Sequence, residues 1–104
     1  MSVAELDAKS FKEIITGSSV LVDFYATWCG PCRNMLKELE KFSTEHPEIR
    51  VGKVNIESDE NKELAAMFDV STIPSLFFFR DGQLVTHLTG YFPARGLAEK
   101  LGLQ

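Results

Sequence analysis

The amino-acid sequence predicts an α/β fold with a central mixed β-sheet and helices on both of its faces. Segments with strand and helix patterns alternate along the chain, as expected of such layers. The stretch VLVDFYA, residues 20–26, is almost continuously apolar, which is typical of a strand covered on both faces. Asp81-Gly82 is a strong turn signal between two later strands, so part of the sheet should be antiparallel.

Two short elements are expected before this central strand. Residues 2–6 are predicted to form an edge strand. Asp7 can cap a helix, because its side chain accepts hydrogen bonds from the free amides of a first helical turn. Gly17 ends this helix, and its apolar residues are Phe11, Ile14 and Ile15.

A longer helix and a second strand are predicted to follow. Pro31 suits a first helical turn, where its missing N–H costs no hydrogen bond. His46-Pro47 ends the helix. Between them, apolar residues recur at helical spacing: Met35, Leu36, Leu39 and Phe42. The stretch RVGKVNIE, residues 50–57, indicates a strand, and the resulting strand–helix–strand unit should have a right-handed crossover.

The last part of the chain is predicted to hold a short helix, a hairpin and a closing helix. Ser58 or Asp59 begins the short helix, whose inward residues should be Leu64, Ala65, Met67 and Phe68. SLFFF, residues 75–79, should be a buried strand that pairs across the turn with QLVTHLT, residues 83–89. Pro93 begins the closing helix, with Leu97 and Leu101 on one side.

Length and charge limit the classes of function. The 104 residues fit one domain, residues 1–104. The net charge is −4 and no basic cluster is present, which argues against nucleic acid as a partner. The longest apolar runs are far too short to cross a membrane, and the first residues do not resemble a secretory signal. We therefore expect a soluble, cytoplasmic protein, and nothing in the sequence requires more than a monomer.

The chain has only two cysteines, in the stretch WCGPC, and three roles compete for them. A structural disulfide between Cys29 and Cys32 would close a very small loop, which stabilises little in the chain-entropy model. A zinc site is disfavoured because there is no second cysteine pair, and His46 and His87 lack the spacing of metal ligands. No metal is therefore expected. Redox chemistry is the remaining role.

The redox role has a physical reason at each position of this motif. Residues three apart at a helix start lie about 5–6 Å apart, within reach of a disulfide. Cys29 precedes the first turn, where free amides and the helix dipole favour a thiolate, so Cys29 is the expected nucleophile. Cys32, one turn further in, should be less exposed and should resolve the mixed disulfide. Gly30 leaves the approach open, and Pro31 stiffens the loop.

With the preceding DFYAT, the WCGPC motif resembles the thioredoxin family, and the resemblance covers essentially the whole chain. It implies a thioredoxin-like fold and a protein disulfide reductase that takes part in electron transport and cell redox homeostasis. A redox-active disulfide would replace any bound cofactor. NADPH would be used only indirectly, through a thioredoxin reductase, and the other partners would be proteins that contain disulfides.

Asp23 and Lys53 are expected to assist the cysteines. Asp23 is an acid within an apolar strand, so burial should raise its pKa and make it a proton acceptor near neutral pH. The family resemblance implies that this carboxylate helps to deprotonate Cys32. It also implies that Lys53 lies near Asp23 and tunes it, although a solvent-facing lysine explains this residue equally well from the sequence.

Pro74, in STIPSL, resembles the family's cis-proline loop, which packs against the cysteines. The resemblance implies that the backbone of Ile73 pairs with an extended substrate segment. An apolar contact patch around Cys29 is then expected from six residues: Trp28, Gly30, Pro31, Ile73, Pro74 and Gly90. The three phenylalanines at 77–79 should be core residues, and His46 and His87 should be surface residues.

Three positions depart from the family pattern. Lys37 stands where many relatives have a helix-kinking proline, so this helix should be straighter. Tyr25 replaces a common tryptophan, and Tyr91 follows Gly90 where small residues are frequent. Two other functions stay open: an oxidase or isomerase, whose members usually have histidine in place of Pro31, and a binding module in which the redox chemistry is incidental.

Overall fold

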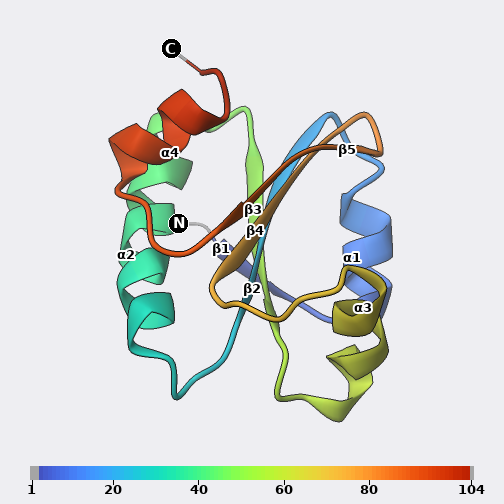
Figure 1. The fold of residues 1–104 in the computed structure, drawn as a ribbon. Coiled ribbons are helices and arrows are strands. Elements are labelled where there is room, and N and C mark those ends of the chain that lie inside the picture. Colours follow the sequence, from blue (N-terminus) through green and yellow to red (C-terminus); the bar gives the residue numbers. More distant parts are fainter. Residues whose placement is uncertain (1–2, 104) are drawn as a thin grey trace.

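The computed structural model of the 104-residue chain describes residues 3–103. Within that range it contains a five-stranded sheet in the order β1-β3-β2-β4-β5, with helices on both sides (Figure 1). The strands are β1 (Val3–Leu6), β2 (Ser19–Tyr25), β3 (Arg50–Asn55), β4 (Ser75–Arg80) and β5 (Gln83–Thr89). The helices are α1 (Ala8–Ile14), α2 (Gly30–Glu45), the 3₁₀ turn η1 (Asp59–Asn61), α3 (Lys62–Met67) and α4 (Ala94–Lys100).

Strand β2 is the centre of the sheet and makes it mixed. It runs parallel to β3 and antiparallel to β4, and the β4–β5 hairpin is antiparallel, as Asp81-Gly82 predicts. Both turn residues have positive φ, of 53° and 81°, which matches the primed turns that join hairpin strands. Each β2 residue from Val20 to Tyr25 pairs with the β3 residue thirty positions later, from Val20 with Arg50 to Tyr25 with Asn55.

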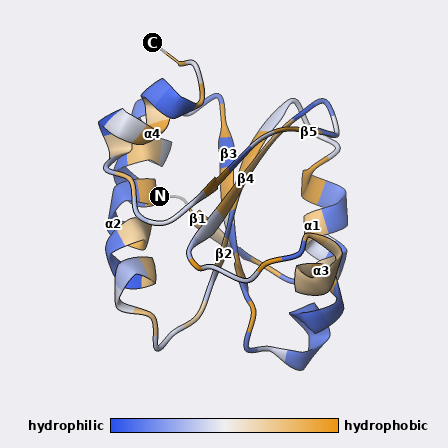
Figure 2. Cartoon of the chain, in the orientation of Figure 1, coloured by the Kyte–Doolittle hydropathy of each residue, from blue (hydrophilic) through white to orange (hydrophobic). Residues whose placement is uncertain are grey.

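Helices α2 and α4 cover one face of the sheet, and α1 and α3 cover the other (Figure 1). Colouring by hydropathy shows the apolar helix sides turned toward the sheet (Figure 2). The consecutive residues Phe77, Phe78 and Phe79 illustrate the two layers. Phe78 packs in the cluster beneath α2 and α4, whereas Phe77 and Phe79 pack against α1 and α3. The prediction that all three are core residues is confirmed.

Helix boundaries follow the predicted local signals. The Asp7 side chain accepts a hydrogen bond from the Ser10 amide at 2.9 Å, and the Ser10 hydroxyl accepts one from the Asp7 amide, so α1 begins with a capping box. Helix α2 is continuous past the exposed Lys37 and ends before His46. The Ala94 amide at the start of α4 donates to Glu38 of α2 at 2.8 Å, which ties the two helices together.

Several sequence predictions differ from the structure. Met67 is 69% exposed, because Leu64 and Phe68, four residues apart, form the inward side of α3 and Met67 lies beside it. Strand β3 ends at Asn55 and not at the predicted residue 57. The Asn55 side chain accepts a hydrogen bond from the Glu57 amide, and the chain turns there. His46 is less exposed than expected, since its ring packs 4.7 Å from that of Phe42.

The first predicted strand is found as β1 over Val3–Leu6, while Ser2 lies outside the described residues. No helix between residues 3 and 103 has the length and apolar character needed to cross a membrane.

Gly52 is the position in β3 where the sheet tolerates no side chain. A Cβ there would lie 2.9 Å from Cγ of the buried Leu6 and 3.3 Å from the Ala4 carbonyl oxygen. We predict that Gly52→Ala lowers the free energy of unfolding by about 1–3 kcal/mol through overpacking, measured by urea denaturation. In Gly96→Ala of α4 the Cβ would meet Pro93 Cγ at an ordinary 3.5 Å. This control should be neutral or stabilising, and equal stability of the two variants would contradict the prediction.

Candidate active site

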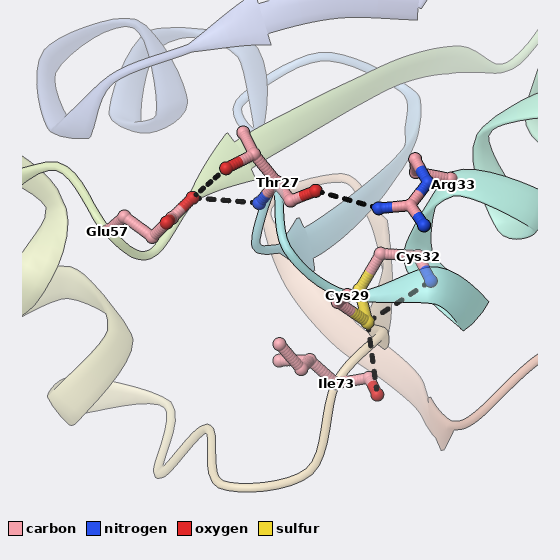
Figure 3. The surroundings of a disulfide bond; sticks show 6 residues. All are labelled: Thr27, Cys29, Cys32, Arg33, Glu57 and Ile73. Carbon is pink, nitrogen blue, oxygen red and sulfur yellow. Dashed lines mark hydrogen bonds between the residues drawn. A yellow bond between two sulfur atoms is a disulfide. The ribbon is translucent and has the colours of Figure 1, made fainter.

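The two cysteines form a disulfide at the N-terminus of α2 (Figure 3). Cys29 is the N-cap residue and Cys32 lies in the first turn, with 5.2 Å between their Cα atoms. The Cys29 Sγ accepts a hydrogen bond from the Cys32 amide at 3.2 Å. Their exposed fractions are 5% and 3%, so Cys32 is the less exposed of the pair, as predicted.

This position favours negative charge on Cys29 after reduction. The residue has extended backbone geometry, with φ −89° and ψ 113°, and its sulfur therefore faces the free amides of the first turn. Those amides and the helix dipole stabilise an anion at a helix N-terminus. A thiolate is the nucleophile of disulfide exchange, so the geometry supports attack by Cys29.

The loop before β4 lies against the disulfide. The Ile73–Pro74 peptide bond is cis, as the family resemblance implies. The Ile73 carbonyl oxygen is 4.0 Å from the Cys29 Sγ (Figure 3). The Gly90 amide donates to the Pro74 carbonyl at 2.8 Å, so these two loops are joined beside the disulfide.

The predicted contact patch is uneven in exposure. Trp28 is 69% exposed and Pro31 is also exposed, next to Cys29 and Cys32 in the chain. Ile73, Gly30 and Gly90 are partly exposed, whereas Pro74 is buried. Pro74 therefore adds little to the exposed surface of the predicted patch.

Asp23 is buried in the middle of β2, with 1% of its surface exposed, so a solvated acid is excluded. Burial raises the pKa of Asp23 well above its usual range, and the positive charge of Lys53 opposes this effect. Its Oδ1 atom has no hydrogen-bond partner among residues 3–103. A cavity of about 250 Å³ reaches both Asp23 and Cys32.

Lys53 lies beside Asp23 in the β2–β3 register. Its side chain is 22% exposed, and its Nζ is 3.7 Å from Glu5 Oε1 and 5.2 Å from the centre of the Tyr25 ring. Lys53 therefore acts on Asp23 through its charge while its ammonium contacts Glu5 and Tyr25.

Three residues near the disulfide were not identified from the sequence as parts of the site: Thr27, Arg33 and Glu57. The Thr27 amide and hydroxyl both donate to Glu57 Oε1, at 2.7 and 2.8 Å, and Arg33 donates to the Thr27 carbonyl at 3.1 Å (Figure 3). The Thr27 amide lowers the pKa of Glu57. These bonds fix the segment that leads into Cys29. Only the thirty-residue register of β2 and β3, extended from Tyr25–Asn55, could have indicated the Thr27–Glu57 pair.

The remaining candidate groups lie elsewhere. His87 is exposed, as predicted, and stacks on Phe77 at 4.1 Å while it shares a hydrogen bond of 2.8 Å with Ser75. Among residues 3–103, no three His, Cys, Asp or Glu side chains gather in a way that could hold a metal ion.

Comparison with known proteins gives consistent matches. The Thioredoxin family model matches residues 2–102. A thioredoxin from Chlamydia pneumoniae is 42% identical over 85 residues, which are 82% of this chain and 81% of the relative. One from Alicyclobacillus acidocaldarius is 43% identical over 94 residues, 88% of each chain. The solution structure of the oxidised thioredoxin from Plasmodium falciparum superposes with a TM-score of 0.83 at 28% identity, covering 94% of this chain and 93% of its own.

The burial of Asp23 predicts a pH-dependent cost to stability. Its folded pKa is raised above the value of about 3.9 in an unfolded chain. The folded state is thus penalised as the pH rises above about 4, and the full penalty is reached above the folded pKa. Asp23→Asn removes the ionisable group and should raise the free energy of unfolding at pH 8 but much less at pH 4.

Urea denaturation between pH 4 and pH 8 measures this difference. Asp59→Asn, at an exposed aspartate of η1, is the control and should show no such gain. A gain for Asp23→Asn that is independent of pH would contradict the assignment of a raised pKa.

Proposed function

Because the chain belongs to the thioredoxin family, we propose a specific role for each residue around its disulfide. The protein is a thiol–disulfide oxidoreductase that reduces protein disulfides through the reversible Cys29–Cys32 disulfide. The observation that supports the proposed roles most directly is the position of Cys29, at the N-cap of α2 and beside the Ile73 carbonyl.

In the proposed first step, the Cys29 thiolate attacks one sulfur of a substrate disulfide. A bond forms between Cys29 Sγ and that sulfur, and the other substrate sulfur leaves as a thiolate. The amide of Cys32, which already donates to the Cys29 Sγ, supports the attacking anion. Gly30 and Pro31 keep this turn short and rigid at the helix start.

In the second step, Cys32 attacks Cys29 Sγ and releases the second substrate thiolate. The substrate gains two electrons, and the Cys29–Cys32 disulfide forms. Cys32 must lose its proton first, and the Asp23 carboxylate is the proposed acceptor, because both side chains line one cavity. Its raised pKa suits proton transfer near neutral pH. Lys53 tunes this acceptor through its charge.

The substrate segment is proposed to lie along the loop of Ile73 and Pro74. Its backbone would pair with Ile73, in a short case of strand addition, and its side chains would contact the exposed Trp28. Pro74 and Gly90 hold this loop against the disulfide through their hydrogen bond. Main-chain pairing gives affinity with little side-chain selectivity, which suits a reductase of many proteins.

Electrons are proposed to come from NADPH through a thioredoxin reductase, and the other partners are disulfide-containing proteins. We also propose that the protein acts as a monomer in the cytoplasm, where thiols are kept reduced. The family membership supports these assignments, because the residues that carry the family's chemistry are all present in this chain.

Single cysteine variants test the order of the two steps. With Cys32→Ser, the mixed disulfide cannot be resolved, and a covalent complex with a disulfide-containing protein such as insulin should accumulate. With Cys29→Ser, no such complex should form, because Cys29 at the N-cap of α2, and not Cys32, is the proposed attacking group. Mass spectrometry under non-reducing conditions measures both. Equal trapping by the two variants would reject the assignment of Cys29 as nucleophile.

The reduction potential distinguishes a reductase from an oxidase or isomerase. We expect a reduction potential near −270 mV, roughly that of thioredoxin. This expectation follows from the family membership. Trp28 fluorescence in a series of dithiothreitol buffers can follow the transition. A value between roughly −120 and −180 mV would instead indicate an oxidant or isomerase.

A further inference from the structure

Three charged residues from neighbouring strands form one row across the sheet. Lys53 of β3 pairs with Glu5 of β1 on one side and with Asp23 of β2 on the other. The strands are parallel and the three residues are in register, so their side chains point to the same face, toward α2. The row therefore has a base between an exposed acid at the sheet edge and a buried acid at the centre.

The contacts of Lys53 are unequal on its two sides. Its Nζ pairs with Glu5 Oε1 at 3.7 Å, whereas Oδ1 of Asp23 has no hydrogen-bond partner. Tyr25 contributes to this arrangement in two ways. Its ring lies 5.2 Å from the Lys53 Nζ, and its hydroxyl donates to both carboxylate oxygens of Glu5, at 2.8 and 3.0 Å.

Tyr25 is a permanent donor in this cluster. Burial, and then the hydrogen bond to Glu5, raises the pKa of Tyr25 far above 10, so its hydroxyl keeps its proton at physiological pH. Glu5 is thus held in one orientation, with Lys53 beside it.

We propose that Glu5 is a positioning residue that, fixed by Tyr25, holds the Lys53 ammonium at the outer end of the row and so sets the proton affinity of Asp23. This inference rests on the proposed role of Asp23 as proton acceptor for Cys32. In that role, the position of one ammonium determines how readily the acceptor takes a proton.

Within residues 3–103, the other groups around Asp23 do not supply a second cation that acts on its carboxylate. From α2, Cys32 and Arg33 line the same cavity, and the Arg33 guanidinium donates to the Thr27 carbonyl. From β4, the residue paired with Asp23 is the apolar Leu76. Lys53 is the cation whose charge lowers the pKa of Asp23, against the effect of burial.

Removal of Glu5 has two effects of the same sign. It removes a negative charge, and it frees Lys53 to approach Asp23. Both favour the ionised carboxylate and lower the pKa of Asp23, so a variant of Glu5 alone cannot separate them. Only the second effect requires Lys53, and only the second can be produced by loss of the Tyr25 hydroxyl without a change in charge.

The test is a ¹³C NMR titration of the Asp23 carboxyl group in the oxidised protein, where neither cysteine titrates. Glu5→Gln should increase the ionisation constant of Asp23 about two- to fivefold, the size expected of one partly exposed ion pair. Tyr25→Phe should change it in the same direction by less. In a Lys53→Met background, the effect of Glu5→Gln should shrink to the small direct effect of charge, and the effect of Tyr25→Phe should disappear.

Glu63→Gln, on α3 across the sheet, changes the net charge equally and should leave the Asp23 titration unchanged. Equal effects of Glu5→Gln with and without Lys53, or no effect of Tyr25→Phe, would overturn the proposal. This titration does not depend on turnover. If the shifts occur but the pH profile of insulin reduction does not follow them, then the role of Asp23 as proton acceptor fails and the positioning by Glu5 stands.

Discussion

The parallel pairing of β2 with β3 in a single register is the constraint on which the site depends. The same thirty-residue offset places Lys53 beside Asp23 and Glu57 beside Thr27. A shift of one residue would move Asp23 to the opposite face, away from α2 and the cysteines. The register therefore positions both the buried acid and the segment that leads into Cys29.

Burial on both faces of β2 holds this register in place and also gives Asp23 its properties. Helix α2 covers one face and α1 covers the other, so every β2 residue from Val20 to Phe24 is buried. A carboxylate in this strand loses most of its hydration, and its neutral form is favoured. The sheet thus holds the proposed proton acceptor at a cost in stability that an apolar residue would avoid, which is typical of functional sites.

Much of the fold and of the redox centre could be predicted from local patterns. The apolar run of β2, the cap at Asp7 and the Asp81-Gly82 turn each depend on neighbouring residues, and all were confirmed. The cis bond before Pro74 was confirmed too, but only the family resemblance indicated it. The prediction that Met67 faces inward was wrong, because a helix of six residues has too few turns for its periodicity to define a face. Contacts between distant segments, such as Thr27 with Glu57, required the register, which no local pattern contains.

The row of Glu5, Lys53 and Asp23 connects the edge of the sheet to its most buried ionisable group. Strand β1 does not pair with β2, because β3 lies between them. The Lys53 ammonium of β3 nevertheless links Glu5 of β1 to Asp23 of β2 electrostatically. Tyr25 matters here because a tryptophan at this position has no hydroxyl to donate to both oxygens of Glu5. In a relative with tryptophan there, an acid at the position of Glu5 would lack this second partner and would orient the lysine less firmly. The identity of residue 25 therefore determines how firmly the edge strand can position the lysine beside the proposed proton acceptor.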